Sequence, residues 1–196
     1  MSNDTSYSLL EKAIHTDNDG AWSELDSRYR AFICHIIRSF QISDNDFDDL
    51  VQQVMIKLMN SLKSYDREKG QFRNWLAALV RSKCLMYFRT QKKELKHKDA
   101  LEKQANLATE DEPSKIDSWI ASEWEDYVST IALDRVRESY RGKSVEVFEM
   151  LLEGMTIEEV MEKTGLTLQT VYTMKARVKK SVMFEIRSVV RDLEGR

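Results

Sequence analysis

Apolar side chains recur at steps of three and four residues along much of the chain, the spacing that places them on one face of an α-helix. The clearest run covers residues 47–62, where these apolar residues share one stripe: Phe47, Leu50, Val51, Val54, Leu58, Met59 and Leu62. The polar residues Asp49, Gln52 and Gln53 lie on the opposite face. The pattern predicts a helix that buries one face and leaves the other in solvent.

The same periodicity predicts helices over about residues 24–40 and 71–93, the second preceded by a polar loop that contains Gly70. Ser43, three residues before Asp46, is the predicted N-cap of the helix over residues 47–62. A short side-chain oxygen at this position can accept the unpaired N–H groups of the first turn. These helices predict one small helical domain over residues 1–98.

The periodicity weakens across residues 99–117, which contain the only proline and the acidic triplet Glu110, Asp111 and Glu112. This composition predicts a linker. Helical spacing resumes at residue 118 with Trp119 and continues toward the C-terminus, which predicts a second helical domain over residues 118–196. The expected fold class is all-α, with two small helical domains joined by a linker.

Within the second domain, residues 156–180 have the plan of a helix-turn-helix. Thr156 and Glu159 have the spacing of a capping box, in which each side chain accepts the backbone N–H of the other residue. Gly165 permits a left-handed turn, and Thr167 is a second predicted N-cap. A plain αα-hairpin with a solvated basic face is the alternative interpretation.

The second helix of this motif has two distinct faces. Its inner stripe is apolar, with Val171, Met174, Val178 and Val182. Its outer face carries small, polar and cationic side chains, the types that can approach base edges and phosphates in a DNA groove. These outer residues are Gln169, Thr170, Tyr172, Thr173, Ala176, Arg177 and Lys180.

Composition narrows the function classes further. The 196-residue chain is 42% hydrophobic and 32% charged with one proline, and its formal net charge is −3, which argues against a generally basic DNA-coating protein. Cations nevertheless predominate in residues 81–98 and 175–191. The chain shows no signal peptide and no apolar run of about 18 residues, so we expect a cytoplasmic protein without membrane insertion.

The sequence offers no catalytic or metal site. His15, His35 and His97 are scattered, Cys34 and Cys84 lack metal-ligand spacing, and no glycine-rich phosphate loop is present. The aspartates at 44–49 lack the glycine and terminal glutamate of a calcium loop. We therefore expect no enzyme activity, no catalytic residues, no cofactor and no metal.

Two segments resemble conserved parts of the sigma-70 family. Residues 49–89 combine a DLVQQ helix, a YDREKG loop, an FRNWL segment and a basic helix, and they are similar to sigma domain 2. Residues 147–180 are similar to sigma domain 4, whose helix-turn-helix reads the −35 element. With only these two domains, the chain resembles the extracytoplasmic-function (ECF) group of sigma factors.

The resemblance implies an alternative sigma factor that binds core RNA polymerase and directs promoter recognition and transcription initiation. The expected partners are promoter DNA and core polymerase, through the clamp helices of its largest subunit and its flap. Asp49, Gln52 and Gln53 are the implied clamp contacts. The resemblance also adds an anti-sigma factor or another regulator to the partners to be expected. The rival interpretation is a two-domain helix-turn-helix regulator that acts without docking on the polymerase.

Family positions imply contacts to both promoter elements. For the −10 element these are Tyr65, Asp66, Arg67, Arg73, Trp75, Arg81, Lys83 and Arg89. Phe72 is assigned to the core, whereas Trp75 is either a core residue or an aromatic at the duplex edge. For the −35 element the implied contacts are Tyr172, Thr173, Arg177 and Lys180, with Arg177 either reading a guanine or binding a phosphate.

Overall fold

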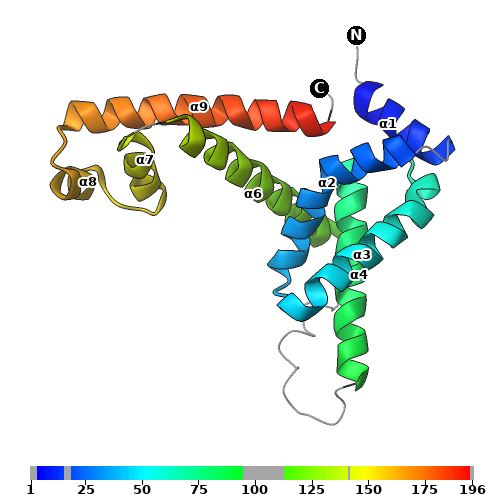
Figure 1. Ribbon diagram of the computed structural model, residues 1–196. Coiled ribbons are helices and arrows are strands. Elements are labelled where there is room, and N and C mark those ends of the chain that lie inside the picture. Colours follow the sequence, from blue (N-terminus) through cyan, green and yellow to red (C-terminus); the bar gives the residue numbers. More distant parts are fainter. Residues whose placement is uncertain (1–3, 16–18, 95–112, 141, 195–196) are drawn as a thin grey trace. The chain divides into compact units, whose positions relative to one another are not determined.

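The structure is a computed structural model that describes residues 4–15, 19–94, 113–140 and 142–194. Every regular element in these ranges is helical, which confirms the predicted all-α class (Figure 1). The chain divides into two compact units, one that ends at Glu125 and one that begins at Asp126. Each unit is described separately below.

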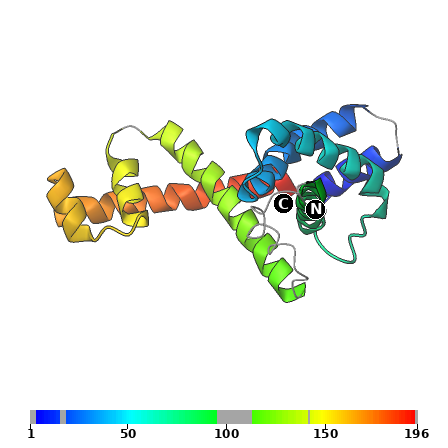
Figure 2. The same cartoon turned by 90° about the horizontal axis from the view of Figure 1, so that it is seen from below.

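The first unit is built around a crossing of three long helices. It comprises α1 (Asp4–His15), α2 (Asp19–Ser39), α3 (Asp44–Ser61), the short 3₁₀ helix η1 (Leu62–Ser64), α4 (Phe72–Glu94) and the first half of α6 (Pro113–Ser139). Figure 2 shows α4 nearly along its axis, with α2 and α3 beside it. The helices from α2 to α4 match the three predicted from periodicity.

The core of this unit forms where the apolar stripes of α2, α3 and α4 meet. Side chains from all three helices are fully buried, so each contributes roughly 1.5–3 kcal/mol relative to an exposed position. Those without any exposed surface include Leu25, Phe32, Ile33, Ile36, Ile37, Val54, Leu58, Leu76 and Val80. The predicted inner stripe of α3 is buried at Leu50, Val51, Val54, Leu58 and Leu62.

Two details of α3 differ from the sequence predictions. Met59, predicted on the inner stripe, is 52% exposed, because its position lies about 100° around the helix from the centre of that stripe. Ser43 does occupy the N-cap position, but its side chain accepts no backbone N–H. Its hydroxyl instead donates a 2.8 Å hydrogen bond to the Asp46 carboxylate, which leaves the first turn without a side-chain cap.

The second unit consists of the remainder of α6 together with α7 (Ser144–Leu152), α8 (Ile157–Thr164) and α9 (Leu168–Glu194). Figure 1 shows α7 and α8 beside the first half of α9. One apolar cluster joins α7, α8 and α9 through Val147, Met150, Val160 and Val171. A second joins α6, α7 and α9 through Val136, Val145, Phe148 and Val178.

The boundary between the two units does not fall within residues 99–117, the predicted linker. Residues 99–112 of that segment, with Lys96 and Lys98 before it, lie outside the described residues. Residues 113–117 are the first turns of α6, and the division falls between Glu125 and Asp126, inside this helix. Pro113 suits the first helical position because a proline there has no N–H to leave unpaired.

Candidate functional site

The outer face of α3 combines polar and apolar side chains that all reach solvent. Asp49, Gln52 and Gln53 are exposed, and Ile56 and Met59 beside them are 51% and 52% exposed. Positions 49, 52, 53 and 56 share one helical face. The described residues provide no hydrogen-bond or ion-pair partner for the three polar side chains. We call this surface, formed by the five residues, the α3 outer face.

The loop before α4 is ordered by an aromatic cluster. The rings of Tyr65, Phe72 and Trp75 lie 5.3–5.6 Å apart, and the Tyr65 hydroxyl donates a 2.9 Å hydrogen bond to the Gly70 carbonyl. The Asp66 carboxylate accepts the Glu68 N–H at 2.9 Å. Phe72 is 6% exposed, which confirms its core assignment, whereas Trp75 is half-buried at the edge of the cluster.

A hollow of about 720 Å³ lies beside this loop, within the size range of small-ligand pockets. The predicted loop residues Tyr65, Asp66 and Arg67 line one side of it, and α1 lines the other. The sequence did not indicate that α1 takes part, because Leu10 and Ile14 have only the ordinary spacing of an amphipathic helix. The complete lining is Leu10, Glu11, Ile14, Lys63, Tyr65, Asp66, Arg67 and Glu68.

The predicted cations of α4 do not share one face. Arg89 is exposed on the same side of the helix as Trp75 and Met86, and Met86 is 59% exposed. Arg73 and Arg81 are half-buried on another side, and Lys83 is half-buried on a third. The structure therefore separates the implied −10 contacts into an outer stripe with Trp75 and Arg89 and a partly covered pair, Arg73 and Arg81.

The first half of α6 covers this arginine pair within the first unit. The Arg73 guanidinium lies 4.7 Å from the centre of the Trp124 ring, and that of Arg81 lies 5.8 Å from Trp119. Both distances are typical of cation–π contacts. The sequence predicted a helix that contains Trp119, but it gave no sign of the surface on which this helix packs.

The predicted capping box, left-handed turn and second N-cap of residues 156–180 all form. The Thr156 N–H donates to the Glu159 carboxylate at 2.7 Å, and the Glu159 N–H donates to the Thr156 hydroxyl at 3.2 Å. The hydrogen bond from the Thr156 backbone holds the pKa of Glu159 below its ordinary value. Gly165 is left-handed with φ +71°, and Thr167 caps α9 by accepting the Thr170 N–H at 3.3 Å.

The outer face of α9 presents the implied −35 contacts to solvent. Tyr172 is 50% exposed, and Thr173, Arg177 and Lys180 are exposed on a stripe with spacings of four and three residues. Arg177 lies 5.5 Å from the centre of the Tyr140 ring, which orients its guanidinium. A shallow groove of about 270 Å³ borders this stripe and is lined by Ser144, Gln169, Thr170, Thr173, Met174 and Arg177.

Comparison with known proteins finds a family match within the first unit. Residues 25–94 match the model of the Sigma-70 region 2 family. This match covers most of α2, all of α3, the loop and α4. Residues 25–94 are thus similar to sigma-70 region 2, which agrees with the resemblance found for residues 49–89.

A solved structure is also similar, that of CnrH in complex with the cytosolic domain of CnrY. It shares 21% sequence identity, covers 94% of this chain and 99% of that chain, and has a TM-score of 0.37. No curated protein matches the sequence. None of the helices in the described ranges is both long and apolar enough to cross a membrane.

Proposed function

We propose that the protein is a sigma factor of the extracytoplasmic-function type, which binds core RNA polymerase in the cytoplasm and directs it to promoters. The α3 outer face carries this proposal, because it lies inside the matched region 2 and its polar groups are unpaired among the described residues. Exposed Ile56 and Met59 supply the apolar area that a protein interface needs beside its polar contacts. A basic helix of the polymerase clamp would complement Asp49.

Promoter contacts follow from the two DNA-facing surfaces. Trp75, Arg89 and the loop around Tyr65 would bind an unstacked −10 strand, since aromatic rings stack on bases and cations neutralise phosphates. Thr173, Arg177 and Lys180 on α9 would enter the major groove of the −35 element. The helix-turn-helix supplies this second surface whether or not the polymerase is present.

The test is association with core polymerase. Asp49→Lys should weaken binding by about tenfold or more, because it reverses the one charge among the five residues of the α3 outer face. Glu125→Lys is the control: it reverses an exposed carboxylate on α6, outside the α3 outer face, and should bind normally. Equal binding by wild type and Asp49→Lys would reject this docking face.

Run-off transcription separates the proposal from a polymerase-independent regulator. Arg177→Ala should reduce initiation at dependent promoters by about 5- to 150-fold if Arg177 reads a guanine, which corresponds to roughly 1–3 kcal/mol. Arg177→Lys would restore much of this loss only for a phosphate contact. Sequence-specific DNA binding by the free chain, with no effect of the chain on initiation by core polymerase, would favour the regulator.

A further inference from the structure

Two tryptophans at the start of α6 are each held by one aromatic ring of α2 and one arginine of α4. Trp124 meets the Phe32 ring edge-to-face at 5.2 Å and also lies near Arg73. Trp119 meets Phe40 at 5.7 Å and lies near Arg81. The pairing places this part of α6 antiparallel to both α2 and α4 within the first unit.

A polar contact lies between the two tryptophans. The His35 Nε2 atom is 3.4 Å from the Glu123 carboxylate, which joins α6 to the middle of α2. Ile120, one residue after Trp119, is 4% exposed, and Trp124 is 7% exposed. The contact of α6 with α2 and α4 therefore involves several side chains over residues 119–124. We call these residues the α6 cover.

The α6 cover contacts Arg73 and Arg81, two of the cations that are expected to bind the −10 strand. A guanidinium that lies against an indole ring cannot offer the same face to a base, and half-burial limits its access to a phosphate. Arg89 is exposed and Trp75 is half-buried, and both lie on a side of α4 away from Arg73 and Arg81. The DNA surface of the first unit is therefore only partly available.

We infer that the α6 cover is an autoinhibitory segment, which occupies Arg73 and Arg81 in the free chain and is displaced when the −10 strand binds them. This inference rests on the proposed function, and it adds Arg73 and Arg81, which the family resemblance implies as −10 contacts, to the DNA-binding residues proposed above. When a site is open in only a fraction of molecules, its apparent affinity equals the intrinsic affinity multiplied by that fraction. Loss of the cover should therefore tighten DNA binding.

The experiment measures binding of a fluorescein-labelled, mixed-sequence single-stranded DNA 12-mer to the full-length chain. The Trp119→Ala/Trp124→Ala double variant should bind about tenfold more tightly than wild type, the gain expected if roughly one molecule in ten is open. Adding Arg73→Ala and Arg81→Ala should abolish the gain. Trp22→Ala, which removes a half-buried tryptophan of α2 outside the cover, is the control and should bind as wild type does.

Two further measurements test the inference even if the alanine variant does not fold. The Trp119→Phe/Trp124→Phe variant keeps a ring at each position and should show an intermediate gain. In wild type, amide exchange of residues 117–125 should accelerate when the 12-mer binds. Unchanged affinity in both variants would overturn the inference that the α6 cover is autoinhibitory, and so would unchanged exchange of residues 117–125 when the 12-mer binds.

The two proposals fail in different ways. If neither wild type nor the double variant binds the 12-mer, the cover is rejected, because removing a cover must reveal the site beneath it. Association with core polymerase, measured through Asp49→Lys, then still tests the proposed function. Conversely, normal docking on the polymerase with no gain in the tryptophan variants rejects the cover alone.

Discussion

The Tyr87 hydroxyl donates a 2.7 Å hydrogen bond to the Asp46 carboxylate and so joins α4 to the first turn of α3 across 41 positions of sequence. Asp46 also accepts the Ser43 hydroxyl. The bond from Tyr87, followed by that from Ser43, lowers the pKa of Asp46. Burial and the nearby Asp46 raise the pKa of Tyr87. The pair fixes α3, which carries the α3 outer face, against α4, which carries Trp75 and Arg89.

Tyr87→Phe should lower the urea midpoint of unfolding at pH 7. Because the folded pKa of Asp46 is depressed, its contribution is present above the ordinary value of 3.8 and is lost as the pH falls through the folded pKa. The difference between wild type and variant should therefore shrink in acid. A difference of the same size at pH 3 and pH 7 would contradict this assignment.

Thr156→Ala should destabilise the second unit by about 1 kcal/mol, since it leaves the Glu159 N–H without its capping acceptor. Thr156→Ser keeps the oxygen and should retain most of the stability. Chemical denaturation monitored by circular dichroism gives both values. Equal losses in the two variants would show that the threonine methyl group, and not the cap, is responsible.

Gly165→Ala should cost about 1–2 kcal/mol, because residue 165 has φ +71° and an L-residue is strained there. No atom lies within 4 Å of the added Cβ, so the cost comes from the backbone alone. Gly165→Asn should cost less, because asparagine tolerates this conformation better. If asparagine proved as costly as alanine in thermal unfolding, the backbone explanation would fail.

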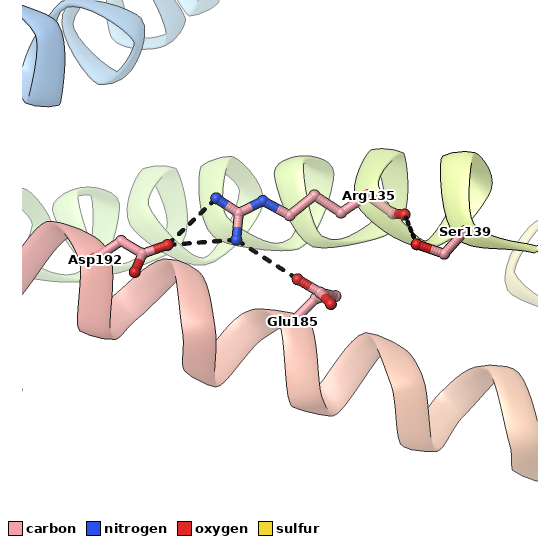
Figure 3. Close-up of polar contacts among 4 residues, drawn as sticks. All are labelled: Arg135, Ser139, Glu185 and Asp192. Atoms are coloured by element: carbon pink, nitrogen blue, oxygen red, sulfur yellow. Dashed lines mark hydrogen bonds and ion pairs between the residues drawn. The ribbon is translucent and has the colours of Figure 1, made fainter.

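Arg135 pairs with Glu185 and Asp192 at 3.5 and 3.4 Å and fastens the C-terminal half of α9 to α6 (Figure 3). These groups are partly exposed, so Arg135→Met should lower global stability by no more than about 1 kcal/mol. Amide exchange of residues 186–193 should accelerate more clearly. Arg187→Met, at an exposed position for which no ion pair is found among the described residues, is the matched control and should leave exchange unchanged.

Burial should separate the two cysteines by reactivity. It raises the pKa of Cys84 to about 12 and also raises that of the half-buried Cys34, where the nearby Arg38 partly opposes the effect. Iodoacetamide should therefore modify Cys34 slowly and Cys84 only after unfolding, because the thiolate is the reacting form. Peptide mass spectrometry at pH 8 checks this order, and early labelling of Cys84 would contradict it.

Local signals in the sequence were sufficient for the helices and for the turn between α8 and α9. The Thr156 and Glu159 spacing, Gly165 and the stripe from Leu50 to Leu62 are each decided within one or two helical turns. The prediction that the Ser43 side chain caps α3 was wrong, because its hydroxyl is turned toward the Asp46 carboxylate and donates a hydrogen bond to it.

Long-range packing was not predictable in the same way. Nothing near Arg73 or Trp124 in the sequence indicates that they meet, since they lie 51 positions apart and a cation–π contact has no local pattern. One wall of the hollow beside Tyr65 is likewise formed by α1, which is far from the loop along the chain. The predicted linker boundary depended on weak periodicity, which did not reveal where α6 begins.

The position of the unit boundary inside α6 decides how the protein can be cut into stable pieces. A C-terminal fragment that starts at Asp126 would divide a helix, whereas one that starts at Pro113 would carry Trp119 and Trp124 without Phe32 and Phe40 to shield them. The longer piece would expose two large indoles to water and tend to self-associate. Replacing both tryptophans with polar residues should give a fragment that remains monomeric at high concentration.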